Sequence, residues 1–160
     1  MNQQTLILLK PDALKRQLDQ KIVDIFLRNG FHIVYQRKVK VKKDIILHHY
    51  QEVIDRLKLD YLPQAILNEF EHELVSIIIF SHRHHDAIAL GRQVIGATDP
   101  SKASPETIRG QFGEDTLPRS IEEKRMLRNL IHASDSMEAV RRECQLWLGV
   151  ELNQLLKLQD

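Results

Sequence analysis

The sequence has a single cysteine and almost no excess charge. Cys144 is the one cysteine among 160 residues, so no intrachain disulfide can form, and a reducing cytoplasm is the expected location. The 23 basic and 22 acidic side chains leave a formal net charge of +1. Because nucleic-acid-binding domains usually carry a clear basic excess, we expect no nucleic-acid partner.

The N-terminus lacks a basic segment and a long apolar run. Its apolar run covers residues 6–9 alone, which is too short for a signal peptide or a transmembrane span. A length of 160 residues predicts a single domain, 1–160, that can bury a sizeable core without disulfides. These absences predict a soluble cytoplasmic protein with no membrane partner.

Helical and extended patterns alternate along the chain. Apolar runs and period-two alternation predict strands over 5–9, 31–41, 74–80 and 130–132. Apolar residues at helical spacing predict helices over 12–29, 44–57, 62–70, 85–95 and 135–148. This order predicts an α/β (α+β sandwich) fold, with a ferredoxin-like βαββαβ core whose antiparallel four-stranded sheet is covered by helices.

Local signals refine these boundaries. Gly30 is expected to close the first helix, Asp44 to cap the second, and Ser134 or Asp135 to cap the last. The strand over 31–41 is expected to place its odd-numbered residues on one face. Residues 149–160 are expected to form a surface segment.

Residues 96–128 show little periodicity and many turn formers. A loop of this length inside a small domain is usually functional. Polar residues that break the structural pattern lie along this loop, beside it or at strand ends, and they are Lys10, Arg92, Thr98, Arg109, Asn129 and His132. Arginine offers a planar clamp for phosphate and lysine a point charge, so this set could surround a polyphosphate.

Five segments containing these residues resemble the signatures of the nucleoside diphosphate kinase family, in the family's order. They are Lys10-Pro11-Asp12-Ala13, Gly91-Arg92, Gly96-Ala97-Thr98-Asp99-Pro100, Thr107-Ile108-Arg109-Gly110 and Asn129-Leu130-Ile131-His132-Ala133-Ser134-Asp135-Ser136. The resemblance covers roughly residues 5–148, and the segment around His132 is highly specific. A lone histidine at a strand end is more often structural, so His132 owes its weight to the surrounding motif.

The resemblance implies a role for each matching residue. His132 would be the nucleophile, phosphorylated on its δ nitrogen. The phosphates would be held by Lys10, Arg92, Thr98 and Arg109, and the ribose by Asn129 with help from Lys10. Tyr50 would lie near the histidine, and Ser134 and Glu143 would support it, with Glu143 orienting the ring.

The resemblance also implies the reaction and its partners. A nucleoside triphosphate would donate its γ-phosphate to His132, and a diphosphate would then take it, in a ping-pong cycle. Magnesium would bridge the nucleotide phosphates without dedicated protein ligands. The chain would form a homo-oligomer, a hexamer or a tetramer built on dimers.

The sequence departs from the family pattern at several positions. Ala133 and Glu106 stand where the family often has glycine. If the family's glycine at position 106 needs a positive φ, then Glu106 implies a loop of different shape in this chain. The family's Arg-Pro-Phe-Phe segment is missing, which leaves Tyr61 as the candidate to stack on the base. Residues 113–128 are longer than the family's usual link and rich in charge.

Three alternatives stay open at this point. The chain could be a non-catalytic, nucleotide-binding or interaction module of the same fold, although the intact set of phosphate ligands favours the enzyme. The segment His82-Arg83-His84-His85-Asp86 could bind a metal, but adjacent histidines point in different directions, so a surface loop and helix start is favoured. Lys38, Lys40, Lys42 and Lys43 could contact nucleic acid, but a solvated strand edge is the preferred interpretation.

Overall fold

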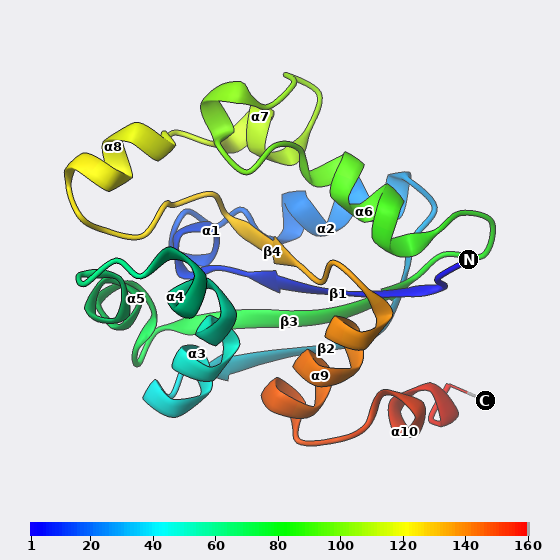
Figure 1. The fold of residues 1–160 in the computed structure, drawn as a ribbon. Coiled ribbons are helices and arrows are strands. Elements are labelled where there is room, and N and C mark those ends of the chain that lie inside the picture. The colour runs from blue at the N-terminus through cyan, green and yellow to red at the C-terminus, as the bar shows by residue number, and fades with distance from the viewer. Residues whose placement is uncertain (160) are drawn as a thin grey trace.

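Four strands form one antiparallel sheet in the order β2–β3–β1–β4 (Figure 1). They are β1 (Gln4–Leu9), β2 (His32–Lys40), β3 (Leu74–Ser81) and β4 (Ile131–Ala133). The structure, a computed structural model, describes residues 1–159. This strand order, with a helical connection after β1 and after β3, is that of a ferredoxin-like core, so the predicted fold class is confirmed.

The two central strands are buried on both faces. In β1, Leu6 and Leu8 belong to one core cluster, whereas Ile7 and Leu9 belong to the other. The same division separates Ile77 from its neighbour Ile78 in β3. Consecutive apolar residues therefore mark a strand with helices on both sides, as the sequence predicted.

Helices cover each face of the sheet (Figure 1). One face packs against α3 (Lys43–His49), α4 (Gln51–Leu57), α5 (Leu62–Phe70), α9 (Met137–Leu148) and α10 (Leu152–Lys157). The other packs against α1 (Pro11–Lys15), α2 (Asp19–Arg28), α6 (Ala87–Ile95) and α7 (Ile108–Phe112). Within residues 1–159, no helix has the length and apolar character needed to cross a bilayer.

Two helices predicted as continuous are each broken in the structure. The predicted helix over 12–29 divides into α1 and α2, because Gln17 adopts a left-handed φ of 57°. The predicted helix over 44–57 divides into α3 and α4 at Tyr50. Lys42 precedes α3, so Asp44 lies in the first turn and does not cap the helix. The second break turns the chain at Tyr50.

The predicted alternation along residues 31–41 is confirmed from Tyr35 onward but wrong before it, because β2 contains a bulge. Ile33 pairs with Phe80 and Tyr35 pairs with Ile79, which leaves Val34 as an extra residue. Phe31 therefore packs in one core cluster and Tyr35 against the other.

Helix ends and connections differ in part from the predictions. Gly30 follows α2 with a φ of 89°, as expected for a helix-closing glycine. The cap of α9 is Ser136, which accepts a hydrogen bond from the Ala139 N–H, and neither Ser134 nor Asp135 takes this position. The long loop contains short helices, namely η1 (Pro100–Lys102), α7 and α8 (Leu117–Glu122).

The prediction of a C-terminal surface segment is confirmed for most of its described residues, but it is wrong for one side of α10. Residues Leu152 and Leu155 of α10 are buried in the core. Beyond them, the Gln159 side chain donates a hydrogen bond to the Val34 carbonyl. Asp160 lies outside the described residues.

Candidate active site

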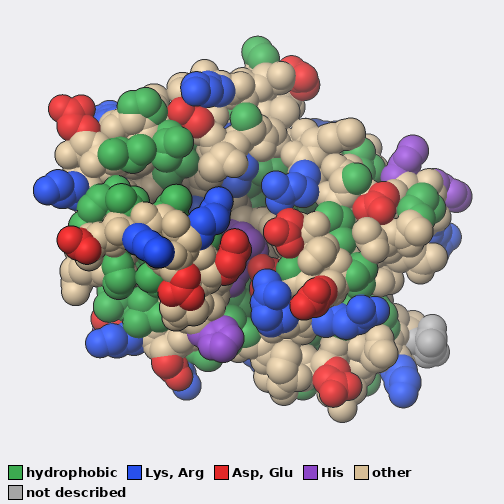
Figure 2. Space-filling model, in the orientation of Figure 1, with side chains coloured by type: hydrophobic (Ala, Val, Ile, Leu, Met, Phe, Trp, Pro, Cys, Tyr) green, Lys and Arg blue, Asp and Glu red, His purple; other side chains and the backbone are tan. Residues whose placement is uncertain are grey.

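A cleft of about 290 Å³ opens where β1 and β4 end beside the α3–α4 turn and α9. Figure 2 shows basic and acidic side chains gathered around the middle of this face, with histidine between them. Eight of the residues predicted from the sequence line the cleft: Lys10, Tyr50, Arg92, Thr98, Arg109, Asn129, His132 and Glu143. Residues separated by more than one hundred positions in the chain therefore meet at one place.

The imidazole of His132 is held by a buried carboxylate. Its Nε2 lies 2.6 Å from Oε1 of Glu143, and the Ser134 hydroxyl donates to the other carboxylate oxygen at 2.7 Å. Burial alone would raise the pKa of Glu143, but the hydrogen bond and charge of His132 outweigh burial and hold this pKa below its usual range. An ionised carboxylate can only accept a hydrogen bond, so Nε2 carries a proton, and in the neutral form of the ring the lone pair is therefore on Nδ1.

His49, to which the sequence assigned no role, is a second imidazole in the site. Its ring centre lies 4.5 Å from that of His132, with the ring planes at 78°. The Trp147 indole N–H donates to His49 Nδ1 at 3.1 Å. Burial, with a smaller contribution from the charge of His132, lowers the pKa of His49 to about 3, so this ring is neutral near pH 7.

Lys10 and Asn129 meet across the ends of adjacent strands. Lys10 directly follows β1, where Leu8 is the register partner of His132. Its Nζ donates to Oδ1 of Asn129 at 2.6 Å, and the Asn129 amide donates to the Thr98 carbonyl at 2.9 Å. Burial, together with the nearby charge of Arg109, lowers the pKa of Lys10 to about 8.

Arg109 ties the long loop to the last strand. Its guanidinium donates to three carbonyl oxygens, those of Gly96, Asn129 and Ile131, at 3.1, 3.1 and 2.6 Å. Burial, followed by the nearby charge of Arg92, lowers the pKa of Arg109 to about 10. The side chain therefore stays charged at neutral pH and braces the wall of the cleft.

The backbone between Asn129 and His132 is strained. Leu130 is fully buried and has a φ of 74°, in the left-handed region that leucine rarely adopts. Its N–H donates to the Asp12 carboxylate and its carbonyl accepts from the Lys10 N–H. Such a conformation persists where surrounding contacts hold it, and it is common at functional sites.

The structure resolves two of the departures noted in the sequence. Neither Ala133 nor Glu106 has a positive φ, so both positions accept a side chain without backbone strain. Tyr61 is half-buried at the start of α5 and is not among the residues that line the cleft. The structure thus does not bring Tyr61 to the cleft.

Several lining residues had no distinguishing motif in the sequence. Beside His49, they include the charged residues Glu52, Arg56 and Arg142 at the mouth. Each lies on a helix or at a helix start where exposed charge is ordinary. The sequence offered one signal for Glu52 and Arg56: both are charged residues within a few positions of Tyr50.

The histidine segment 82–86 forms a loop and a helix start, as favoured from the sequence. Asp86 caps α6 by accepting from the N–H groups of Ile88 and Ala89. His82 is buried, contrary to the surface position expected for this segment, and its Nδ1 accepts from the backbone N–H groups of His84 and His85. Its hydrogen bonds therefore shape the loop.

Comparisons with known proteins identify the family of this chain. The family model described as nucleoside diphosphate kinase matches residues 3–152. A nucleoside diphosphate kinase of Synechocystis is 32% identical over 149 residues, covering 93% of this chain and 89% of the relative. One of Mycobacterium avium is 36% identical over 148 residues, covering 92% and 97%.

Solved structures give the same result. The nucleoside-diphosphate kinase of Borrelia burgdorferi, solved as a transition-state mimic with bound vanadate and ADP, aligns with a TM-score of 0.84 and 27% identity. The alignment covers 94% of this chain and 88% of that chain. Family match, relatives and fold coincide, and the chain belongs to the nucleoside diphosphate kinase family.

Proposed function

We propose that this chain carries out its phosphoryl transfer through a phosphohistidine at His132. As a member of its family, the chain is an enzyme, a nucleoside diphosphate kinase that transfers phosphate from nucleoside triphosphates to nucleoside diphosphates. The observation that carries the proposal is the contact between His132 Nε2 and Glu143, which fixes the proton on that nitrogen. A neutral ring with its lone pair on Nδ1 is a competent nucleophile.

The reaction divides into two balanced half-reactions. The Nδ1 lone pair forms a bond to the γ-phosphorus, the bond between that phosphorus and the β–γ bridging oxygen breaks, and the diphosphate leaves with the electron pair. A second diphosphate then attacks the phosphohistidine through a terminal oxygen, and the electron pair returns to Nδ1. Because the ring gains positive charge while it is phosphorylated, the Glu143 carboxylate stabilises the intermediate.

The remaining side chains take roles that their positions support. Lys10, Arg92, Thr98 and Arg109 hold the phosphates, since all four line the cleft that contains His132. Asn129 contacts the ribose, with Lys10 fixing its amide oxygen. Tyr50 packs against the His49 ring, and Ser134 orients Glu143.

Magnesium enters the site with the nucleotide phosphates. Within residues 1–159, the one group of three potential metal-ligating side chains whose ligand atoms lie within 4.8 Å of one another is His49, His132 and Glu143. This set offers two nitrogens and one carboxylate, whereas magnesium prefers oxygen ligands. Phosphate oxygens would supply these, and the ion would neutralise charge on the transferred group.

Family membership also supports the wider assignments that we propose. Residues 96–128 form the nucleotide-binding loop of a single domain, supported by Thr98 and Arg109 in the cleft wall. The enzyme acts in the cytoplasm as a homo-oligomer, a hexamer or tetramer built on dimers. Light scattering of the purified chain measures its mass, and a monomeric mass would contradict this last assignment.

The phosphohistidine is tested by labelling. The protein is incubated with γ-labelled ATP and magnesium, and free nucleotide is removed. We expect acid-labile, alkali-stable label that is discharged by added diphosphate. His132→Ala should abolish the label, and His48→Ala, which alters an exposed histidine of α3, should retain it. Label that survives His132→Ala would show that another residue is the nucleophile.

A further inference from the structure

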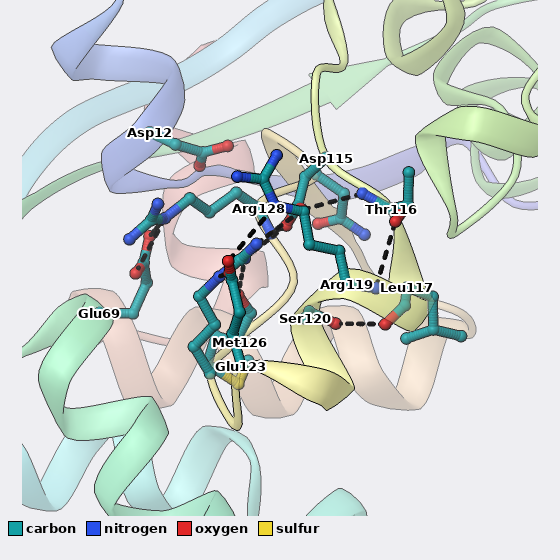
Figure 3. Close-up of polar contacts among 12 residues, drawn as sticks. Asp12, Glu69, Asp115, Thr116, Leu117, Arg119, Ser120, Glu123, Met126 and Arg128 are labelled. Carbon is teal, nitrogen blue, oxygen red and sulfur yellow. Dashed lines mark hydrogen bonds and ion pairs between the residues drawn. The ribbon is translucent and has the colours of Figure 1, made fainter.

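Residues 113–128, the charged segment between Arg109 and Asn129, are organised around one buried carboxylate. Asp115 is 8% exposed. Its two oxygens accept from both terminal nitrogens of Arg125, at 2.7 and 2.9 Å, and from the backbone N–H groups of Thr116 and Arg128, each at 2.9 Å. Figure 3 shows these bonds converging on Asp115 beside α8. Four donors match the four acceptor positions of a carboxylate, so the buried charge is compensated.

The segment is also attached at its two ends. Before Asp115, Arg16 of the α1–α2 turn donates to the Phe112 carbonyl at 2.8 Å and to Glu114 at 2.9 Å. After it, Arg128 pairs with Glu69 of α5 at 3.1 Å (Figure 3). These outer pairs are largely exposed and contribute little each. Asp115 is therefore the contact on which the shape of the segment depends.

One of the Asp115 hydrogen bonds leads directly into the active site. The donor is the backbone N–H of Arg128, and the next residue is Asn129, whose amide is fixed between Lys10 and the Thr98 carbonyl. Leu130, one residue further, holds its left-handed conformation. A side chain that fixes position 128 thus fixes the start of the strained turn that presents the Asn129 amide.

We infer that Asp115 is a positioning residue for the nucleoside part of the substrate. Asp115 binds Arg125 and the Arg128 N–H, and it thereby fixes the backbone at Asn129 in the position where the side-chain amide of Asn129 can contact the ribose. The inference rests on the proposed function, in which Asn129 contacts ribose. It goes beyond that function by assigning the segment 113–128, which is longer than the family's usual link, to substrate positioning.

The positioning role distinguishes between two phosphoryl donors. ATP requires the sugar contact, whereas phosphoramidate is a donor without a nucleoside. Its P–N bond breaks on transfer, ammonia leaves, and the phosphoryl group bonds to His132 Nδ1. Loss of Asp115 should therefore slow labelling by ATP and spare labelling by phosphoramidate. A general loss of folded protein, or damage at His132, would slow both.

The experiment compares wild type, Asp115→Asn and Arg125→Lys with Glu122→Gln, a control that alters an exposed carboxylate of α8. Single-turnover labelling of His132 is followed with each donor. For Asp115→Asn we expect the second-order rate with ATP to fall about tenfold to a hundredfold, with the phosphoramidate rate within about twofold of wild type. Arg125→Lys keeps the positive charge but loses the bidentate geometry, so its rate with ATP should lie between those of wild type and Asp115→Asn.

Three results would overturn the inference. They are an unchanged ATP rate in Asp115→Asn, an equal fall with both donors, and a loss in Glu122→Gln as large as that in Asp115→Asn. If Asp115→Asn does not fold, the same comparison in Arg125→Lys decides the matter. Absence of ATP labelling in the wild type would overturn the proposed function itself, whereas wild-type labelling with an unaffected variant overturns the positioning role alone.

Discussion

Oε1 of Glu143 lies 2.6 Å from Nε2 of His132, and in the proposed function this contact leaves Nδ1 as the nitrogen that reacts. Glu143→Gln would remove the negative charge that balances the ring as Nδ1 is phosphorylated. We expect the rate of His132 labelling by ATP to fall on the order of a hundredfold. Rapid-quench labelling measures this rate. Glu138→Gln, an exposed carboxylate in the first turn of the same helix, should label normally, and a wild-type rate in Glu143→Gln would remove the carboxylate from the mechanism.

Lys10 should make nucleotide affinity dependent on pH. Its pKa is lowered to about 8 by burial and by Arg109, so the ammonium is present below that pH and is lost above it. ADP affinity should therefore fall as pH rises through about 8, by up to about tenfold per pH unit. Bound phosphate favours the charged form, so at pH of about 9 binding should take up a proton. Calorimetry in two buffers of different ionisation enthalpy detects that proton, and Lys10→Met should bind weakly without uptake.

Asp115 should contribute stability with a definite pH dependence. Its pKa is lowered to about 2, because hydrogen bonds from Arg125, Arg128 and Thr116 outweigh the effect of burial. A carboxyl whose pKa is lower in the folded than in the unfolded protein stabilises the native state. This stabilisation is complete at pH values above the pKa of the unfolded chain, and it is lost as pH falls through about 2. Asp115→Asn should therefore lower the free energy of unfolding by about 2 kcal/mol at pH 7, and by about half that at pH 3. Urea titrations at the two pH values measure the difference, and a pH-independent loss would show that the charge is not responsible.

Gly96 should tolerate no side chain. Its φ is 95° with a ψ of −176°, and a Cβ atom there would overlap the Thr107 side chain. Gly149, with a φ of 70° and nothing within 4 Å of its built Cβ atom, is the matched control. We expect Gly149→Ala to cost about 1 kcal/mol of stability and Gly96→Ala to cost more, roughly 3 kcal/mol. Thermal melts compare the two, and equal costs would mean that the Thr107 side chain moves away freely.

The sequence predicted correctly those strands whose pattern of apolar residues is explained by one arrangement only. The runs at 5–9 and 74–80 are apolar on consecutive residues because both strands are central, and the structure has both of them. The break at Gln17 and the bulge at Val34 were missed, since each depends on backbone geometry that neighbouring residues do not specify. α10 was missed because its few buried side chains, Leu152 and Leu155, are too sparse to give a periodic signal.

The active site shows the same limit at the level of side chains. Residues with a recognisable motif, such as Lys10 and His132, could be assigned to a common cleft from the sequence alone. His49 and Asp115 could not, because their partners Trp147 and Arg125 are identified by distance in space. A carboxylate in a charge-rich segment is ordinary on its own, and its burial is what sets Asp115 apart.

Arg109 also covers part of one edge of the sheet. β4 is an outermost strand of the sheet. On the side that faces β1, the Leu130 carbonyl accepts from the Lys10 N–H, and the Ser134 N–H donates to the Leu6 carbonyl. On the outer side, the Asn129 and Ile131 carbonyls are capped by the Arg109 guanidinium. Open carbonyls on a sheet edge are a template for strand addition by another chain. The side chain assigned to the phosphates therefore also covers acceptor groups at the edge of the sheet, and we expect its removal to lower solubility as well as turnover.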